Sequence, residues 1–404
     1  MRVLGMISGT SHDGIDTAVV DFRLNGELLT ARIEHSASTV YEPDLRTRLI
    51  AALPPAPVGF DVACQLDTAI GQAFAAAAAS VIQDHQQLPG VGPVDVICSH
   101  GQTVYHWVQD RAAHGTLQLG QPAWIAELTG LPVISDVRAA DVAAGGHGAP
   151  LVPILDVLLL GAFLEQGRAA CALNLGGIAN ATACTTAADP VAWDIGPANA
   201  LIDAVITASP DVPDSYDRGG VIGRSGQVLP DLLDHLLAEV YYQLAAPKSS
   251  GKELFHLGYV QEALHRTSLD PDLPDLVATL TELTAVTVTQ ALSATGTDIV
   301  VASGGGVRNY YLMERLEALM PHVKIIHSDE LGVSADHKEA MAFALIGWAT
   351  THGLPSNVPS CTGASGDRVL GRFTPGQSGR RPHPPPGTTW PTRLTVESAK
   401  HGDE

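Results

Sequence analysis

The stretch Gly5-Met6-Ile7-Ser8-Gly9-Thr10-Ser11-His12-Asp13-Gly14-Ile15-Asp16 decides how this chain is expected to fold. The apolar residues before Ser8 predict one strand, the polar residues that follow predict a tight turn, and the run from Ile15 to Phe22 predicts a second strand. Glycine, serine and aspartate are common in any hairpin turn, so an ordinary β-hairpin is one interpretation. Small residues that let a ligand approach the backbone, beside carboxylates that suit hydrated Mg²⁺, also indicate a phosphate site.

A second stretch of the same kind begins near Ala169. Cys171 to Leu175 predicts a strand, Gly176-Gly177 a turn, and Ile178 to Cys184 the return strand. Two such units half a chain apart indicate a duplicated architecture. A third glycine cluster, Gly304-Gly305-Gly306, follows another apolar strand and precedes a helical pattern.

Composition excludes several classes of protein. With 404 residues, of which 45% are hydrophobic and 16% charged, the chain is long enough for two domains with large cores. The net charge of −20 repels polyphosphate backbones and anionic lipids, so neither nucleic acid nor a membrane is an expected partner. Five scattered cysteines, no apolar run of about twenty residues and no secretory signal predict a reduced, cytoplasmic protein.

Two common nucleotide-binding motifs are absent from the sequence. Ser250-Gly251-Lys252 is followed by Glu253, so the P-loop pattern fails, and no G-x-G-x-x-G follows the first strand. A nucleotide held by two hairpin-bearing halves fits the sequence better than a Rossmann oxidoreductase does.

Several charged residues have both an ordinary and a functional interpretation. Asp194 precedes a Gly-Pro turn, where a lone aspartate is typically a turn or helix-capping residue. Arg138 and Asp141 are typical of a surface ion pair or of a loop anchor, and Lys248 of a solvated charge. Glu339 begins an otherwise apolar helical segment, so either the helix dipole favours it or it lines a cleft.

Taken together, these segments resemble the anhydro-N-acetylmuramic acid kinase family. The resemblance covers about residues 1–373, through motifs at 5–16, 135–141, 143–153, 174–180, 194–199, 247–255, 303–309, 339–344 and 357–364. It implies an α/β, duplicated actin/hexokinase-like (ribonuclease H-like) fold of two lobes with an interlobe nucleotide cleft. We expect a first lobe of residues 1–125 plus 340–373, a second lobe of residues 126–339, and a disordered tail of residues 374–404 that carries Trp390.

The resemblance also implies a reaction. The enzyme would use ATP and Mg²⁺ to phosphorylate O6 of 1,6-anhydro-N-acetylmuramic acid while water opens the anhydro ring, giving N-acetylmuramic acid 6-phosphate and ADP in cell-wall recycling. It also implies a homodimer. Asp194 would be the base that activates the water, and Glu339 would orient the water or the sugar. On charge alone, Arg138 would pair with the lactyl carboxylate.

The remaining expected roles follow from the same resemblance. The nucleotide-binding residues would be Gly9, Thr10, Ser11, His12, Asp13, Gly14, Ile15, Asp16, Asn174, Gly176, Gly177, Gly304, Gly305, Gly306 and Asn309. The sugar-binding residues would be Arg138, Asp141, His100, Gly196 and Asn199, and the metal-binding carboxylates would be Asp13 and Asp16.

Two other classes of function stay open on the sequence. An ordinary sugar kinase on the same fold would transfer phosphate to a free hydroxyl without consuming water. A non-catalytic nucleotide-binding module would bind ADP without sugar-dependent turnover.

Overall fold

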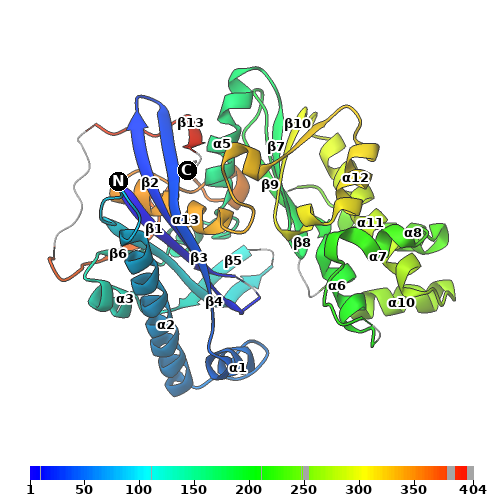
Figure 1. Ribbon diagram of the computed structural model, residues 1–404, viewed down its shortest axis with the longest axis horizontal. Helices are drawn as coiled ribbons and strands as arrows, with labels where there is room; N and C mark the ends of the chain where they lie inside the picture. The colour runs from blue at the N-terminus through cyan, green and yellow to red at the C-terminus, as the bar shows by residue number, and fades with distance from the viewer. Residues whose placement is uncertain are drawn as a thin grey trace. The chain divides into compact units, whose positions relative to one another are not determined.

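The chain forms two compact units (Figure 1) in a computed structural model that describes residues 1–9, 11–110, 112–210, 212–246, 248, 254–379 and 387–397. Unit 1 comprises Met1–Gly161 and His337–Glu404. Unit 2 comprises Ala162–Asp336. The chain therefore leaves unit 1 once and returns to it once.

Unit 1 is built on one mixed sheet. Its strands are β1 (Arg2–Ser8), β2 (Gly14–Asn25), β3 (Leu28–Val40), β4 (Val96–Gln109), β5 (Ala112–Leu119), β6 (Val133–Ser135), β12 (Arg372–Thr374) and β13 (Arg393–Glu397). Its helices are α1 (Pro43–Ala51), α2 (Phe60–Gln86), α3 (Pro122–Thr129), α4 (Ala139–Ala143), α5 (Pro153–Glu165, which continues into unit 2), α13 (Lys338–Thr351) and α14 (Pro359–Thr362).

Unit 2 is built on a second mixed sheet. Its strands are β7 (Ala170–Leu175), β8 (Ile178–Cys184), β9 (Val191–Pro197), β10 (Ile299–Ser303) and β11 (Lys324–His327). Its helices are α6 (Asn199–Thr207), η1 (Arg218–Gly220), α7 (Val221–Ser225), α8 (Pro230–Leu237), α9 (Val240–Gln243), α10 (Leu257–Thr267), α11 (Leu273–Ser293), η2 (Gly305–Arg308), α12 (Tyr310–Leu319) and η3 (Ser328–Leu331).

The two sheets repeat one topology. In unit 1 the central order is β6-β4-β1-β2-β3, and in unit 2 it is β11-β10-β7-β8-β9. In each sheet the first three strands along the chain form an antiparallel meander. A later strand, β4 or β10, pairs in parallel with the first strand, and β6 or β11 pairs in parallel with that one. This is the strand arrangement of ribonuclease H-like sheets, so the predicted duplicated α/β fold is confirmed.

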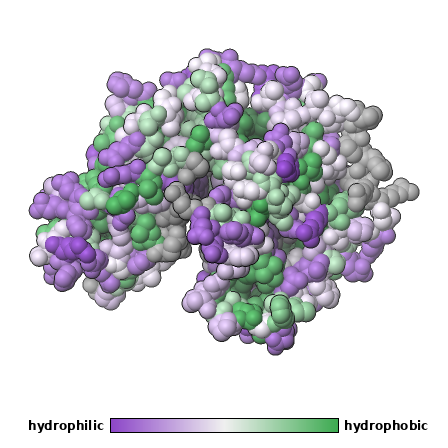
Figure 2. Space-filling view, turned by 180° about the vertical axis from the view of Figure 1, so that it is seen from behind, coloured by the Kyte–Doolittle hydropathy of each residue, from purple (hydrophilic) through white to green (hydrophobic). Residues whose placement is uncertain are grey.

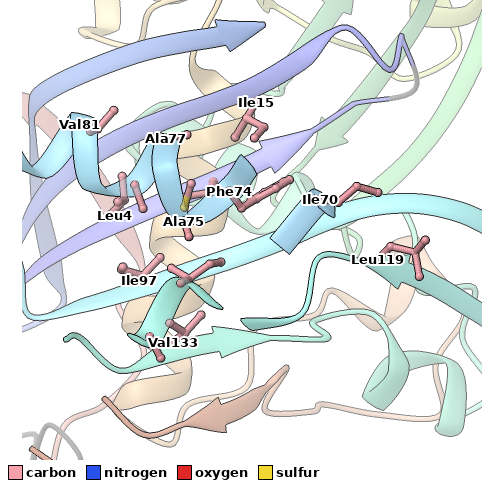
Figure 3. Packing of buried hydrophobic residues seen from close by; sticks show 14 of the residues in the cluster. Leu4, Ile15, Ile70, Phe74, Ala75, Ala77, Val81, Ile97, Leu119 and Val133 are labelled. Carbon is pink, nitrogen blue, oxygen red and sulfur yellow. The ribbon is translucent and has the colours of Figure 1, made fainter. Parts of the chain in front are cut away.

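Alternation along β1 explains how helices cover both faces of the unit 1 sheet. Leu4 and Met6 belong to a buried cluster with Phe74 and Ile70 of α2, which Figure 3 shows packed over the strands. Gly5 points to the other face, where a Cβ atom would lie 2.0 Å from the Ala340 carbonyl oxygen of α13. Only glycine permits this close approach, and it fixes the first turn of α13 against β1.

The core of unit 2 has two clusters that share helix α11. One cluster joins β7 and β8 to α11 and α12, and the other joins α6, α8 and α10 to α11. By length and composition α11 is apolar enough to cross a membrane, but most of it is buried inside the unit. That burial is typical of a core helix in a globular protein.

The expected lobe boundaries need correction. Residues 126–161 lie in unit 1 rather than in the second lobe, because β6 pairs with β4 and with β12 in the unit 1 sheet. The return point also shifts, to His337, so Glu339 lies in unit 1. Strand β6 has only three residues, and its partners lie far from it in sequence.

The predicted disordered tail is wrong for the described part of residues 374–404. Strand β13 adds in parallel to the edge of β3, with Leu394 buried. Trp390, predicted to be mobile, is half-buried, and its ring centroid lies 6.3 Å from that of Trp348. Backbone pairing with β3, one buried leucine and one aromatic contact hold this otherwise polar segment on the sheet.

Exposed apolar side chains are scattered over the described surface. On the face in Figure 2, hydrophilic residues lie between groups of hydrophobic ones. The most exposed large apolar residues, Phe60, Val240 and Tyr310 among them, come from separate elements. Isolated residues of this kind are ordinary at protein surfaces.

Candidate active site

The first hairpin turn lies between β1 and β2 in unit 1. Ser8 Oγ lies 2.6 Å from Gln102 Oε1, and Gln102 Nε2 donates to the Gly9 carbonyl oxygen at 3.2 Å. Ser11 donates to Asp13 at 2.6 Å, and Ser38 of β3 donates to Asp16 at 2.5 Å. Hydroxyl, amide and carboxylate groups thus surround a turn with little bulk. Thr10, the expected phosphate ligand at its tip, lies outside the described residues.

Residues 41–46, which follow β3, hold this turn by hydrogen bonds. Tyr41 N–H donates to the Asp13 carbonyl oxygen at 2.9 Å, and Arg46 Nε donates to the His12 carbonyl oxygen at 3.0 Å. His12 has a φ of 53°, a left-handed conformation that a side chain disfavours and that outside contacts must hold. A Cβ on Gly14 would lie 2.4 Å from the Thr39 carbonyl oxygen, so the turn and this segment are in close contact.

Not every residue of the first turn offers its side chain to a ligand. Ile15, expected to bind nucleotide, is buried in the core cluster with Leu4, so only its backbone is available. Asp13 is exposed and Asp16 half-buried. The turn therefore presents mainly backbone groups and carboxylates.

Glu339 reaches the same region of unit 1 from the first turn of α13. Desolvation by the surrounding protein raises the pKa of Glu339. The charge of Arg138 lowers this pKa, and the charge of Asp16 raises it. Lys338, one residue earlier, forms a buried ion pair with Asp156 at 2.6 Å. This ion pair and the contact with Gly5 fix the position of the first turn of α13, which carries Glu339.

Arg138, His100 and Asp141 are brought together in unit 1. Arg138 Nε donates to His100 Nε2 at 2.8 Å, and its Nη1 donates to the Gly148 carbonyl oxygen at 2.6 Å. Burial lowers the Arg138 pKa to about 10, against the opposing effects of Glu339 and Asp141. Burial and then Arg138 lower the His100 pKa well below its usual value, so the imidazole is neutral.

The second hairpin turn lies in unit 2 and is docked on the start of α6. The Gly176 carbonyl oxygen accepts from the Asn199 backbone N–H at 3.1 Å and from its Nδ2 at 2.8 Å. The Gly177 carbonyl oxygen accepts from Ala198 and Ala200. The carbonyl groups of the turn are thus occupied, and Asn199 has a structural contact besides its expected role at the sugar.

The third glycine cluster contacts the same edge of the unit 2 sheet. A Cβ on Gly304 would lie 2.5 Å from Asn174 Oδ1, and one on Gly306 would lie 2.7 Å from Leu175 Cβ, whereas Gly305 faces open space. Asn309 is buried, and its Oδ1 accepts from Leu312 N–H as the cap of α12. The structure therefore brings the expected nucleotide residues of unit 2 together at the ends of β7 and β10.

Asp194 lies on β9, opposite Asn180 and next to a β-bulge. Its N–H donates to the Lys248 carbonyl oxygen at 2.9 Å, and its own carbonyl oxygen accepts from Tyr241 Oη at 2.8 Å. Lys248, expected to be solvated, is half-buried, and its Nζ donates to the Tyr241 carbonyl oxygen at 2.8 Å. The backbone at Asp194 is therefore held firmly.

Gly196 follows Asp194 on the same strand. A Cβ at this position would lie 2.8 Å from the Tyr242 ring, so the ring packs directly on the glycine. Residues 247 and 249–253 of the neighbouring motif lie outside the described residues.

The carboxylates of the first turn suit a hydrated divalent ion. Asp13 and Asp16 supply oxygen donors, which Mg²⁺ prefers, and neither is enclosed. Within the described ranges no cluster of three or more His, Cys, Asp or Glu residues forms a protein-only cage. That fits Mg²⁺, which is commonly held by one or two carboxylates, by water and by substrate phosphates.

Sequence reasoning missed several residues around these sites. Gln102, Arg46, Asn357 and Thr362 make side-chain contacts to the predicted site residues. The polar His-Gly-Gln-Thr run after an apolar strand was a usable signal for Gln102. Arg46 lies on a short surface helix, where an arginine carries no signal.

A repeated ribonuclease H-like topology with a glycine-rich turn in each unit defines the class of duplicated actin/hexokinase-like proteins. The model of the family described as anhydro-N-acetylmuramic acid kinase matches residues 1–376. A protein of that name from Rhodococcus erythropolis is 50% identical over 388 residues, covering 94% of this chain and 95% of its own. One from Streptomyces avermitilis is 49% identical, covering 98% and 100%. The chain belongs to the anhydro-N-acetylmuramic acid kinase family.

Solved structures align much more weakly. An activator of 2-hydroxyisocaproyl-CoA dehydratase from Clostridium difficile with bound ADPNP is 14% identical, with a TM-score of 0.41 over 86% of this chain and 94% of its own. A ROK family glucokinase from Streptomyces griseus in complex with glucose and AMPPNP is 13% identical, with a TM-score of 0.34 over 85% and 98%. Alignments at this level place no ligand in this chain.

Proposed function

We propose that this kinase phosphorylates O6 of 1,6-anhydro-N-acetylmuramic acid with ATP while water opens the anhydro ring. The products are N-acetylmuramic acid 6-phosphate and ADP, and the enzyme serves cell-wall recycling. The observation that carries this proposal is the family match over residues 1–376, which includes Asp194 and the whole first turn.

Asp194 is the proposed general base. It takes a proton from a water whose oxygen bonds to C1 of the sugar, and the C1–O6 bond breaks as this bond forms. The electron pair released on O6 attacks the γ-phosphorus, and the bond to the ADP oxygen breaks. Asp194 then gives its proton to solvent. Tyr241 and Lys248 hold the backbone of Asp194 by hydrogen bonds. This suits a general base, which must first lie within hydrogen-bond reach of the proton that it removes.

The glycine turns are the proposed phosphate sites. Backbone N–H groups at Gly9 and at Gly176 and Gly177 would donate to phosphate oxygens, where positioning and electrostatics supply most of the rate enhancement. Asp13 and Asp16 would hold Mg²⁺, which when bound neutralises charge on the transferring phosphoryl group. Gly304 to Gly306 would lie against the adenosine.

Arg138 is the proposed partner of the sugar's lactyl carboxylate. A guanidinium supplies local positive charge against the net charge of −20 and pairs with a carboxylate through two parallel hydrogen bonds. Glu339, whose pKa Arg138 lowers and Asp16 raises, would orient the water or the sugar. The active form would be a homodimer in the cytoplasm.

The experiment that tests the proposal is a coupled assay of ADP release. The full chain with ATP and Mg²⁺ is expected to release ADP only after 1,6-anhydro-N-acetylmuramic acid is added. ADP binding without sugar-dependent release would contradict the proposal and favour a non-catalytic nucleotide-binding module.

A further inference from the structure

The carboxylate of Asp141 is buried and is hydrogen-bonded to other protein groups. It is completely buried, and its Oδ1 accepts from Asn357 Nδ2 at 2.8 Å and from Thr362 Oγ1 at 2.7 Å. Its Oδ2 accepts from Gly148 N–H at 2.8 Å. Three donors satisfy most of what two carboxylate oxygens can accept. Direct contact with a sugar, the role expected from the sequence, would require this network to break.

The glycine loop before Gly148 is folded around this carboxylate. Gly146 N–H donates to the Asp141 carbonyl oxygen at 3.0 Å, and a Cβ on Gly146 would lie 2.3 Å from Asp141 Oδ2. Gly148 itself has a φ of 66°. The Asp141 carboxylate therefore fixes the direction of the Gly148 carbonyl group, to which Arg138 Nη1 donates at 2.6 Å.

His100 fixes the other side of the same guanidinium. Its Nδ1 lies 2.8 Å from the Gly101 carbonyl oxygen, which can only accept, so Nδ1 carries the proton. Nε2 of this neutral ring then accepts from Arg138 Nε at 2.8 Å. The Phe343 ring, 4.8 Å away between centroids, packs against the imidazole. Two of the three guanidinium nitrogens are thus held, and Nη2 has no hydrogen-bond partner among the described residues.

We propose that Asp141 and His100 are positioning residues, which hold the Arg138 guanidinium so that its Nη2 is presented to the carboxylate of the substrate. The inference rests on the proposed function and replaces direct sugar contact by these two residues. A flexible arginine would lose rotational freedom on binding, whereas this one is ordered in advance.

The matched pair Asp141→Asn and Thr362→Val separates positioning from folding. Asparagine has one acceptor oxygen where aspartate has two. It cannot accept from Gly148 N–H and also from Asn357 and Thr362, so the loop and Arg138 lose their support. Valine at 362 removes one hydrogen bond on the far side and leaves the Gly148 link intact. We expect Asp141→Asn to weaken sugar binding, measured by calorimetry, about tenfold. Thr362→Val lowers the unfolding temperature but leaves sugar affinity unchanged.

A double variant tests whether Asp141 acts through Arg138. In an Arg138→Ala background, Asp141→Asn is expected to add no further loss of sugar affinity. The same loss with and without Arg138 would overturn the inference. So would equal effects of Asp141→Asn and Thr362→Val on affinity.

His100 supplies an independent arm that does not touch Asp141. Glutamine keeps an acceptor near the position of Nε2, so His100→Gln is expected to retain sugar affinity, while His100→Leu loses it by about tenfold. Equal affinity in both variants would contradict the inference. A wild-type enzyme that does not phosphorylate the sugar would instead refute the proposed function, so the two failures are distinguishable.

Discussion

At the scale of single residues, the proposed mechanism assigns the general base to Asp194. Asp194→Asn keeps the shape of the side chain but removes the base, so kcat is expected to fall by about 10²–10⁴-fold. ADP affinity should stay unchanged, because the change lies outside the glycine turns. Rate assays and calorimetric titration check both expectations.

The matched control for Asp194→Asn is Asp189→Asn, an exposed aspartate just before the same strand. It should leave kcat unchanged. Near-native turnover in Asp194→Asn would remove Asp194 from the mechanism.

A second residue, Glu34, makes stability depend on pH. Burial disfavours its charge, but hydrogen bonds from Arg2, His85 and Arg32 outweigh burial and lower its pKa to about 2. Below the unfolded-state pKa of about 4.3 the unfolded chain binds a proton that the folded chain does not. The stability that Glu34 contributes is therefore present above that pKa and lost as pH falls toward 2.

Denaturant unfolding of wild type and Glu34→Gln from pH 7 to pH 3 tests this linkage. The difference in free energy of unfolding should shrink as pH falls. Glu314→Gln, at an exposed pair with Arg224, is the control and should change little at any pH. A Glu34→Gln difference that is constant across the range would contradict the expectation.

How much of the site the sequence predicts differs from residue to residue. Asp194, Glu339 and the glycine turns were singled out as candidates because their sequence motifs are contiguous. The buried hydrogen-bond network of Asp141 was not predicted, because Asn357 and Thr362, which donate to it, lie more than 200 residues away in sequence. Burial and hydrogen-bond saturation of a carboxylate depend on such distant partners and leave no local pattern.

At the scale of elements, helix α1 supports the first hairpin turn through Arg46. Arg46→Ala removes the hydrogen bond to the His12 carbonyl oxygen, and the left-handed backbone there loses a restraint. We expect the KM for ATP to rise about three- to tenfold with the KM for sugar unchanged.

Arg48 on the same helix provides the control for Arg46. It is exposed and pairs only loosely with Asp44, at 3.8 Å, so Arg48→Ala should not change either KM. Equal KM values for ATP in the two variants would show that α1 does not support the turn.

Local patterns predicted most elements well, since periodicity and turn residues are local. The two hairpins and helix α12 are confirmed. Strand β4 continues through the polar run His100-Gly101-Gln102-Thr103 to Gln109 because β5 pairs with it. Pairing across a sheet extended a segment that its own residues mark as a loop.

At the scale of the whole molecule, the C-terminal strand completes the unit 1 sheet. A chain ending at Gly379 loses β13, with buried Leu394 and the contact of Trp390 with Trp348. We expect its unfolding temperature to fall by at least about 4 °C, given the cost of losing one buried leucine. The freed edge of β3 should also promote self-association.

The control for this truncation is a chain ending at Glu397, which keeps β13. Calorimetry and light scattering compare the two chains. Equal unfolding temperatures would mean that β13 contributes nothing to stability. Sequence composition could not predict this strand, because its order comes from an edge and an aromatic surface supplied by distant residues.

The duplicated topology was predictable from two glycine turns half a chain apart, but the boundaries of the two units were not. They depend on which sheet β6 and β13 join, and a three-residue strand carries no such information. In any duplicated fold, unit boundaries that depend on the sheet joined by a short edge strand are equally hard to predict from sequence.

The most direct test of the account is the reaction in ¹⁸O-water with ATP and 1,6-anhydro-N-acetylmuramic acid. If water opens the anhydro ring as O6 takes the phosphoryl group, mass spectrometry of the product at early times will find one ¹⁸O at C1 and none in the phosphate. Unlabelled carbon 1 with an intact ring would contradict the account and identify an ordinary sugar kinase.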